Sequence, residues 1–295
     1  VQLVKNGEML TDSGTITLQS GTYDRVYFMQ VGGALVGQLG SETNQEKLTL
    51  NITGDASVNK FIDGGQGLLG WSNGNANVVI YSDFEVNVNT TGTVAAIIMT
   101  GEATAKDTIR VYGDLTANIE AGTIMPAANV SEDNYNHDSN TNASLAAGSK
   151  ATYIEGNITY NLGKVGNDDA LLTFQGNVVG SISQMNGGST GSSKGDVTIN
   201  LNSGSYQSIY GAGSHAALDG NVEINYYGGT IAGVIAGTAG AEVSGTRVLN
   251  IIGDLDGGAI NIDSFTDINV LAGGSVVYAD EFILGKYLET FNMEE

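Results

Sequence analysis

Apolar and polar residues alternate in many short stretches of this chain of 295 residues. The clearest examples are GDVTINL, which begins at Gly195, and GNVEINY, which begins at Gly220. Every second residue of these stretches is apolar, which is typical of a β-strand with one buried face. Val197 and Val222 occupy the same place in the two stretches, a step of 25 residues. A step of this length predicts stacked structural repeats.

The same alternation predicts strands elsewhere, each followed by a glycine-rich corner. Their apolar positions are Ile16 and Leu18; Leu48, Leu50 and Ile52; Phe84, Val86 and Val88; Ile109 and Val111; Ile158 and Leu162; and Ile268 and Val270. The step from Phe84 to Ile109 is again 25 residues, so we expect Ile109 to begin a new coil.

A coil of two or three short strands cannot bury its own apolar face, so coils must stack about 4.8 Å apart through parallel backbone hydrogen bonds. The sequence therefore predicts an all-β fold, a right-handed parallel β-helix (β-solenoid) with about 25 residues per coil and on the order of a dozen coils. Asparagines at equivalent outward positions are expected to stack into amide ladders. An irregular β-sandwich or a barrel of hairpins is the alternative fold.

Two polar stretches interrupt the repeats, residues 129–150 and 184–194. We expect them to be loops that leave the solenoid at coil corners and to carry ligand contacts. The predicted organisation is a solenoid over residues 1–277 with these two inserts, followed by a capping or linking segment over 278–295 that has a loose helical spacing.

The composition indicates a folded chain and limits the classes of molecule that it can bind. The sequence has 43 glycines and one proline, and 41% of its residues are hydrophobic. A disordered glycine-rich chain would have few hydrophobic residues, so we expect the glycines to lie between β-strands. A net charge of −21 repels nucleic acid and anionic lipid, which argues against both as partners. No apolar run approaches the roughly 20 residues of a transmembrane helix. Because the chain starts at Val1, we expect a processed form or a segment of a longer protein whose membrane anchor lies elsewhere.

The repeats resemble the β-helical passenger regions of bacterial autotransporters and related surface adhesins. The resemblance rests on residues 195–199 with 208–211 and on 220–224 with 230–234, where glycines and aliphatic residues follow the spacing of those repeats. It implies secretion, display on the bacterial cell surface and an adhesive or scaffolding role. The absence of cysteine is compatible with such a location.

Candidate chemistry is sparse. With no cysteine and two remote histidines, His137 and His215, the chain is not expected to hold zinc or a Cys-His nucleophile. Many β-helical proteins cleave polysaccharides with clustered carboxylates, and Asp168 and Asp169 are the best candidates for such a cluster. The Gly-His-Gly and Arg-x-Lys segments of pectinase-like hydrolases are missing. No catalytic residue is therefore expected.

Other residues are candidates for binding. Asp254 and Asp256 present two carboxylates beside glycines and are weak candidates for a Ca²⁺ site, although no cofactor is expected. Outward aromatic residues can stack on sugar rings, and the candidates are Trp71, Tyr112, Tyr227 and, with His137 in the first insert, Tyr135.

These observations favour a non-enzymatic segment of a secreted or surface-displayed bacterial protein that acts as adhesin or scaffold. Its expected partners are host-cell or matrix glycans and proteins, contacted through the projecting loops. The alternatives are a polysaccharide lyase or hydrolase and a self-associating matrix or filament protein.

Overall fold

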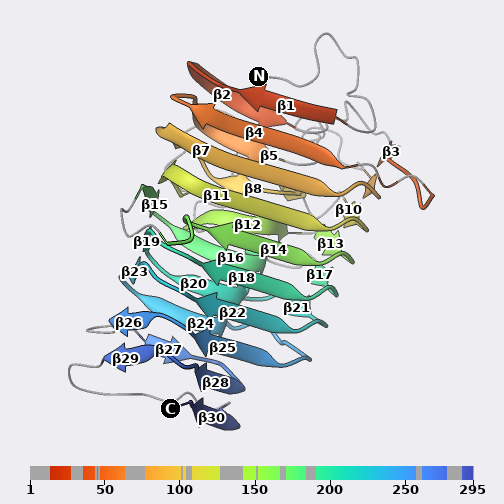
Figure 1. Cartoon of the computed structure of the whole chain (residues 1–295). Helices are drawn as coiled ribbons and strands as arrows, with labels where there is room; N and C mark the ends of the chain where they lie inside the picture. Colours follow the sequence, from red (N-terminus) through yellow and green to blue (C-terminus); the bar gives the residue numbers. More distant parts are fainter. Residues whose placement is uncertain are drawn as a thin grey trace.

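The computed structural model describes residues 14–27, 36–43, 45, 47–63, 77–100, 102–103, 108–126, 142–150, 152–166, 171–183, 191–256, 261–277 and 288–294. These residues form strands and no helix, and the strands pair in parallel with the equivalent strands of the preceding and following coils. Figure 1 shows the coils stacked from the N-terminal to the C-terminal end. The chain is a parallel β-helix, as the alternation predicts.

The strands fall into three columns that run along the solenoid axis. The first column consists of β1 (Gly14–Leu18), β4 (Leu48–Gly54), β7 (Phe84–Val94), β11 (Leu115–Ile124), β14 (Ile158–Leu162), β18 (Val197–Leu201), β22 (Val222–Tyr226), β25 (Arg247–Ile251), β28 (Asp267–Val270) and β30 (Thr290–Met293). These ten strands are the stacked arrows that cross Figure 1.

The second column consists of β2 (Thr22–Tyr27), β5 (Ser57–Asp63), β8 (Ile97–Ile98), β12 (Ala143–Lys150), β16 (Asn177–Ile182), β20 (Ile209–Ala212), β24 (Val234–Thr238) and β27 (Asn261–Asp263), with β9 (Glu102–Ala103) beside the end of β12. The third column consists of β3 (Val36–Leu39), β6 (Asn77–Ile80), β10 (Thr108–Val111), β13 (Thr152–Ile154), β17 (Ser192–Ser193) and β21 (Ala217–Leu218).

Short strands line the corners between columns. One stack begins at the C-terminal end of β11, which pairs with β15 (Leu172–Phe174), and continues through β19 (Ser205–Tyr206) to β23 (Thr230–Ile231). Separately, β26 (Asp254–Asp256) pairs with β29 (Ser275–Val277).

Coil length varies more than the sequence predicts. The step of 25 residues holds from β18 to β22 and from β22 to β25, but equivalent asparagines are 31 residues apart between β7 and β11 and 43 apart between β11 and β14. The prediction that Ile109 begins a new coil is wrong, because Phe84 pairs with Leu115 and Ile109 lies in β10 of the third column. Strands of the first and third columns show the same alternation of apolar and polar residues. Alternation alone therefore does not show to which column a strand belongs.

The first predicted insert is partly wrong. Residues 143–150 form β12, a strand of the second column that pairs with β8 and β16, and only its preceding part, 129–141, lies outside the described residues. Ala143, Ser144, Leu145, Ala146 and Ala147 are all buried. Because both faces of β12 are buried, its sequence does not alternate between apolar and polar residues. Its small and polar residues therefore resemble those of a loop. In the second insert, 184–190 lies outside the described residues and Ser192–Ser193 forms β17.

The inward side chains of the columns form one core. It includes Tyr160, Tyr206 and Tyr226 as its largest fully buried side chains. Their hydroxyl groups donate to backbone carbonyls, as in the bond from Tyr160 to the Val179 oxygen over 3.3 Å. Burial raises the pKa of Tyr160 well above its usual value, so the phenol stays neutral.

A column of glycines precedes the first-column strands where the coils approach closely. It consists of Gly113, Gly156, Gly195, Gly220 and Gly245. A Cβ atom at Gly195 would lie 2.0 Å from the carbonyl oxygen of Gly156, so no side chain fits there.

The C-terminal segment contributes a strand in its described part. Residues 278–287 lie outside the described residues, while Thr290–Met293 forms β30, which pairs in parallel with β28. This part extends the first column. No described helix is long and apolar enough to cross a membrane.

Candidate ligand-binding groove

An asparagine ladder runs along the outer face of the first column. The side-chain amide of each rung donates from Nδ2 to Oδ1 of the preceding rung over 2.8–3.0 Å, through Asn51, Asn87, Asn118, Asn161, Asn200, Asn225, Asn250, Asn269 and Asn292. At its N-terminal end Asn51 donates to the Thr17 hydroxyl over 3.3 Å. The predicted amide ladder is therefore present, and it fixes the rungs in register.

A groove lies beside this ladder, about two residues further along each coil than the ladder asparagine. We call it the amide groove and define it by Thr53, Asn89, Asn118, Glu120, Asn161, Lys164, Asn200, Asn202 and Tyr227. Three adjoining hollows make up the groove. Asn118 and Glu120 line both the first and the second hollow, and Thr53 and Asn89 line both the second and the third. The hollow between Glu120 and Tyr227 has a volume of about 700 Å³, within the usual range of ligand sites.

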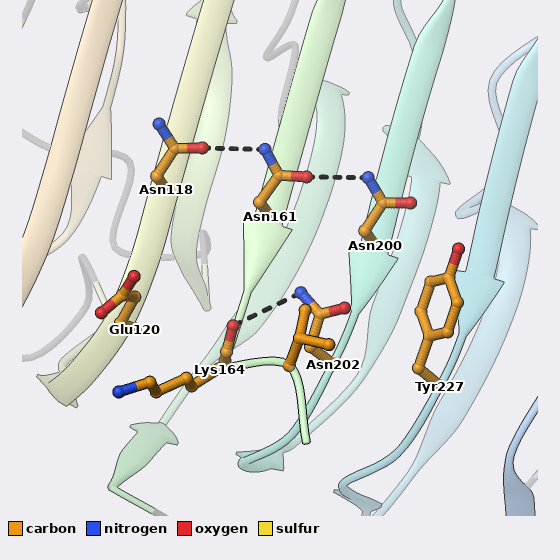
Figure 2. A pocket seen from close by; sticks show the side chains of 9 residues that line it. Asn118, Glu120, Asn161, Lys164, Asn200, Asn202 and Tyr227 are labelled. Atoms are coloured by element: carbon orange, nitrogen blue, oxygen red, sulfur yellow. Dashed lines mark hydrogen bonds between the residues drawn. The ribbon is translucent and has the colours of Figure 1, made fainter. Parts of the chain in front are cut away.

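Figure 2 shows the arrangement of this hollow. The ladder amides of Asn118, Asn161 and Asn200 form one wall, and Glu120 and Tyr227 stand at opposite ends with Lys164 and Asn202 between them. The side chains come from β11, from β14 and the turn after it, from β18 and the residue after it, and from the residue after β22, so successive coils build the groove.

The rim beside β14 is held by a tight turn. Gly163 has a φ of +78°, and a Cβ atom there would lie 2.1 Å from the Ser203 carbonyl oxygen, so glycine is required. The next residue, Lys164, donates its backbone N–H to the Ser203 hydroxyl over 3.0 Å, and that hydroxyl donates back to the Lys164 carbonyl. Val165 follows and is 78% exposed. The turn places a cation and an apolar side chain at the edge of the groove.

The remaining polar groups of the groove are only partly engaged. Glu120 accepts a hydrogen bond from Asn89 Nδ2 over 3.0 Å, and Asn202 Nδ2 donates to the Gly163 carbonyl over 3.3 Å. Tyr227 is 47% exposed, and no ring contact involves it among the described residues. Its side chain is therefore open to a ligand.

Glutamates stand on both sides of the three ladder amides that line the hollow. Glu85 on β7 accepts from Asn87 over 2.9 Å, and Glu223 on β22 accepts from Asn225 over 2.9 Å. Hydrogen bonds from Lys47 and Asn87 lower the pKa of the Glu85 carboxyl, so this group is ionised at neutral pH. Between these rungs the corresponding outward residues are Thr116, Thr159 and Thr198.

The structure brings one of the predicted binding residues, Tyr227, into the groove. Tyr112 is also exposed, at 40%, but its ring stacks on Tyr81 with a centroid distance of 4.9 Å in the corner after the third column. Trp71, Tyr135, His137, Asp168 and Asp169 lie outside the described residues. The contributions predicted for them stay predictions.

The weak calcium candidates are not brought together with further ligands. Asp254 is exposed and accepts a hydrogen bond from the Ser275 hydroxyl over 2.6 Å, while Asp256 ends the same strand, β26. In the described part of the chain no group of three His, Cys, Asp or Glu side chains could hold a metal ion. His215 is exposed, and its Nδ1 lies 2.7 Å from the Ser214 hydroxyl.

Sequence reasoning missed Glu120, Lys164 and Asn202 as members of one site. The signal that could have found their position is the asparagine shared by the strands LTLNI, FEVNV, LTANI, ITYNL, VTINL and VEINY. Aligning the strands on this asparagine gives the true coil steps and places 120, 163, 202 and 227 in one row.

Comparison of the chain with known protein families, with curated proteins and with solved structures found no match. The groove is therefore the feature of this chain that points to a function.

Proposed function

We propose that this chain is the shaft of a secreted or surface-displayed adhesin or scaffold protein and that it holds its ligand in the amide groove. The observation that carries the proposal is the continuous row of solvent-accessible amides, ending at the exposed ring of Tyr227, on a wall braced by backbone and side-chain hydrogen bonds. Polar groups held in fixed positions bind with a small entropic cost, because few side chains must become ordered.

The groove supports binding better than hydrolysis. Most glycoside hydrolases use two carboxyl groups that flank the scissile bond. Among the described residues that line the groove, Glu120 is the one carboxylate. The proposal is accordingly a binding function, with contact through the groove and through the loops that border it.

The test is retention of ligands on the immobilised protein from an array of glycans and extracellular-matrix proteins. Wild type and Tyr112→Ala should retain the same ligand, whereas Tyr227→Ala should weaken retention about tenfold or more, as expected for a central aromatic contact. Tyr112 is a matched control because it is a tyrosine of similar exposure outside the groove. Failure to retain any ligand, or equal weakening by both substitutions, would contradict the proposal.

The same samples test the non-enzymatic part of the proposal. Retained glycans should be recovered at full length after prolonged incubation. Release of fragments that is abolished by Glu120→Gln would instead make the groove an active site.

A further inference from the structure

The amide groove contains an uncharged stretch on a strongly acidic protein. On the outer face of β11, β14 and β18 the two outward positions beside the groove hold threonine and asparagine, from Thr116 and Asn118 to Thr198 and Asn200. The whole chain has a net charge of −21. At the edge of this stretch the charges of Glu120 and Lys164 are opposite. A ligand that fits this surface needs no net charge.

The ladder leaves hydrogen-bonding capacity in this stretch. A primary amide has two N–H donors and an oxygen with two lone pairs. The ladder uses one N–H of Asn161 and one of Asn200, and no second partner of either Nδ2 occurs among the described residues. In the rungs on either side, by contrast, Glu85 and Glu223 accept from the asparagines two residues later. The stretch thus has unused donor and acceptor capacity at Asn161 and Asn200.

The strands of the groove do not offer their backbone to a partner. Strands β7, β11, β14 and β18 each pair with a first-column strand on both sides. A peptide cannot add to this surface as a further strand, which is the common way in which sheets bind extended peptides. Recognition must come from side-chain amides, hydroxyls and Tyr227.

The groove crosses the strands, so its long direction follows the solenoid axis. It extends from Thr53 at β4 to Tyr227 after β22, which at about 4.8 Å per coil is roughly 24 Å. An extended polymer fills a groove of this shape, whereas a single small molecule occupies only part of it.

We infer that the ligand of the amide groove is an uncharged polysaccharide that lies along the solenoid axis, with its hydroxyl groups on the ladder amides and one sugar ring against Tyr227. Sugar hydroxyls both donate and accept, as the amides do, and the apolar face of a sugar ring packs on an aromatic side chain. This inference rests on the proposed binding function of the groove.

The substitution Thr159→Glu tests whether the ligand binds the unused N–H of Asn161. Thr159 lies two residues before Asn161, as Glu85 lies before Asn87, so the new carboxylate should accept the unused N–H of Asn161 in a geometry that the protein already contains. The matched control is Thr290→Glu, which makes the same change two residues before Asn292 on β30, a strand that lies beyond the Tyr227 end of the groove. Circular dichroism verifies that both variants fold.

The measurement is affinity electrophoresis in gels that contain hydroxyethyl cellulose, galactomannan or dextran, with polygalacturonate and hyaluronan as anionic probes. Wild type and Thr290→Glu should be retarded equally by at least one neutral polysaccharide and not by the anionic ones. Thr159→Glu and Tyr227→Ala should each lose about tenfold or more in affinity, and Tyr227→Phe should keep the affinity within about threefold.

Two results would overturn the inference, and they differ in what they imply. If a protein or an anionic glycan is retained in a Tyr227-dependent manner and the neutral polysaccharides are not, the ligand class is wrong while the groove remains a binding site. If neutral polysaccharides bind equally to wild type, Thr159→Glu and Tyr227→Ala, the groove is not the site and the proposed function fails with it.

Discussion

Replacing Asn225 with alanine tests how much the ladder stabilises the fold. Asn225 Nδ2 donates to Asn200 Oδ1 over 3.0 Å and to Glu223 Oε1 over 2.9 Å. Its Oδ1 accepts from Asn250 Nδ2 over 2.8 Å, and the residue is 8% exposed. At a net contribution of about 1 kcal/mol per hydrogen bond, the substitution should lower the free energy of unfolding by about 3 kcal/mol.

The matched control is Asn292→Ala at the last described rung. Asn292 is exposed and donates one ladder hydrogen bond, to Asn269 over 2.8 Å, so its loss should cost about 1 kcal/mol or less. Urea denaturation followed by far-ultraviolet circular dichroism measures both costs, and equal m values would show that the two variants unfold over the same surface. A cost of Asn225→Ala no greater than that of Asn292→Ala would show that the three hydrogen bonds of Asn225 do not stabilise the fold.

Three further substitutions test the packing. Gly195→Ala should destabilise by about 3 kcal/mol or more in urea titrations, because its Cβ would collide with the Gly156 carbonyl. The cost should exceed that of Gly21→Ala, whose Cβ meets no atom within 4 Å and whose cost of about 1–2 kcal/mol comes from its φ of +85° alone; equal costs would contradict the close approach. Ser193→Ala should raise the melting temperature, because the buried hydroxyl has no hydrogen-bond partner among the described residues and removing it relieves a desolvation cost of about 1 kcal/mol; a lower melting temperature would show that the hydroxyl is satisfied. Stability should fall as pH rises above about 10, since the unfolded phenol of Tyr160 ionises there while burial raises its pKa in the folded state. Tyr160→Phe should flatten this alkaline decline, and an unchanged decline would assign it to other groups.

The strand pattern and the parallel stacking could be predicted from the sequence, because an apolar residue at every second position has one physical meaning in a short stretch between glycines. Leu48, Leu50 and Ile52 are buried as expected, and Asn51 points to the outer face. The order of the strands could not be predicted in the same way. Ile109 and Val111 alternate like a first-column strand although they belong to β10 in the third column.

The groove was harder to predict than the fold, because it depends on the coil lengths. Its row contains Glu120, Gly163, Asn202 and Tyr227, which come from four successive coils separated by 43, 39 and 25 residues at the ladder. Only the last of these steps equals the repeat seen in the sequence. Tyr227 was found because its outward position follows from local alternation, while Glu120 and Lys164 carry no local signal of a shared site.

The most direct test of the central claim is a calorimetric titration with oligosaccharides of increasing length, prepared from the neutral polysaccharide that retards the protein. A ligand that lies along the axis contacts amides from successive coils, so the affinity should rise with each added sugar until the chain spans the roughly 24 Å of the groove, and then level off. An affinity that is already complete with a single sugar or a disaccharide would contradict an extended ligand in the amide groove.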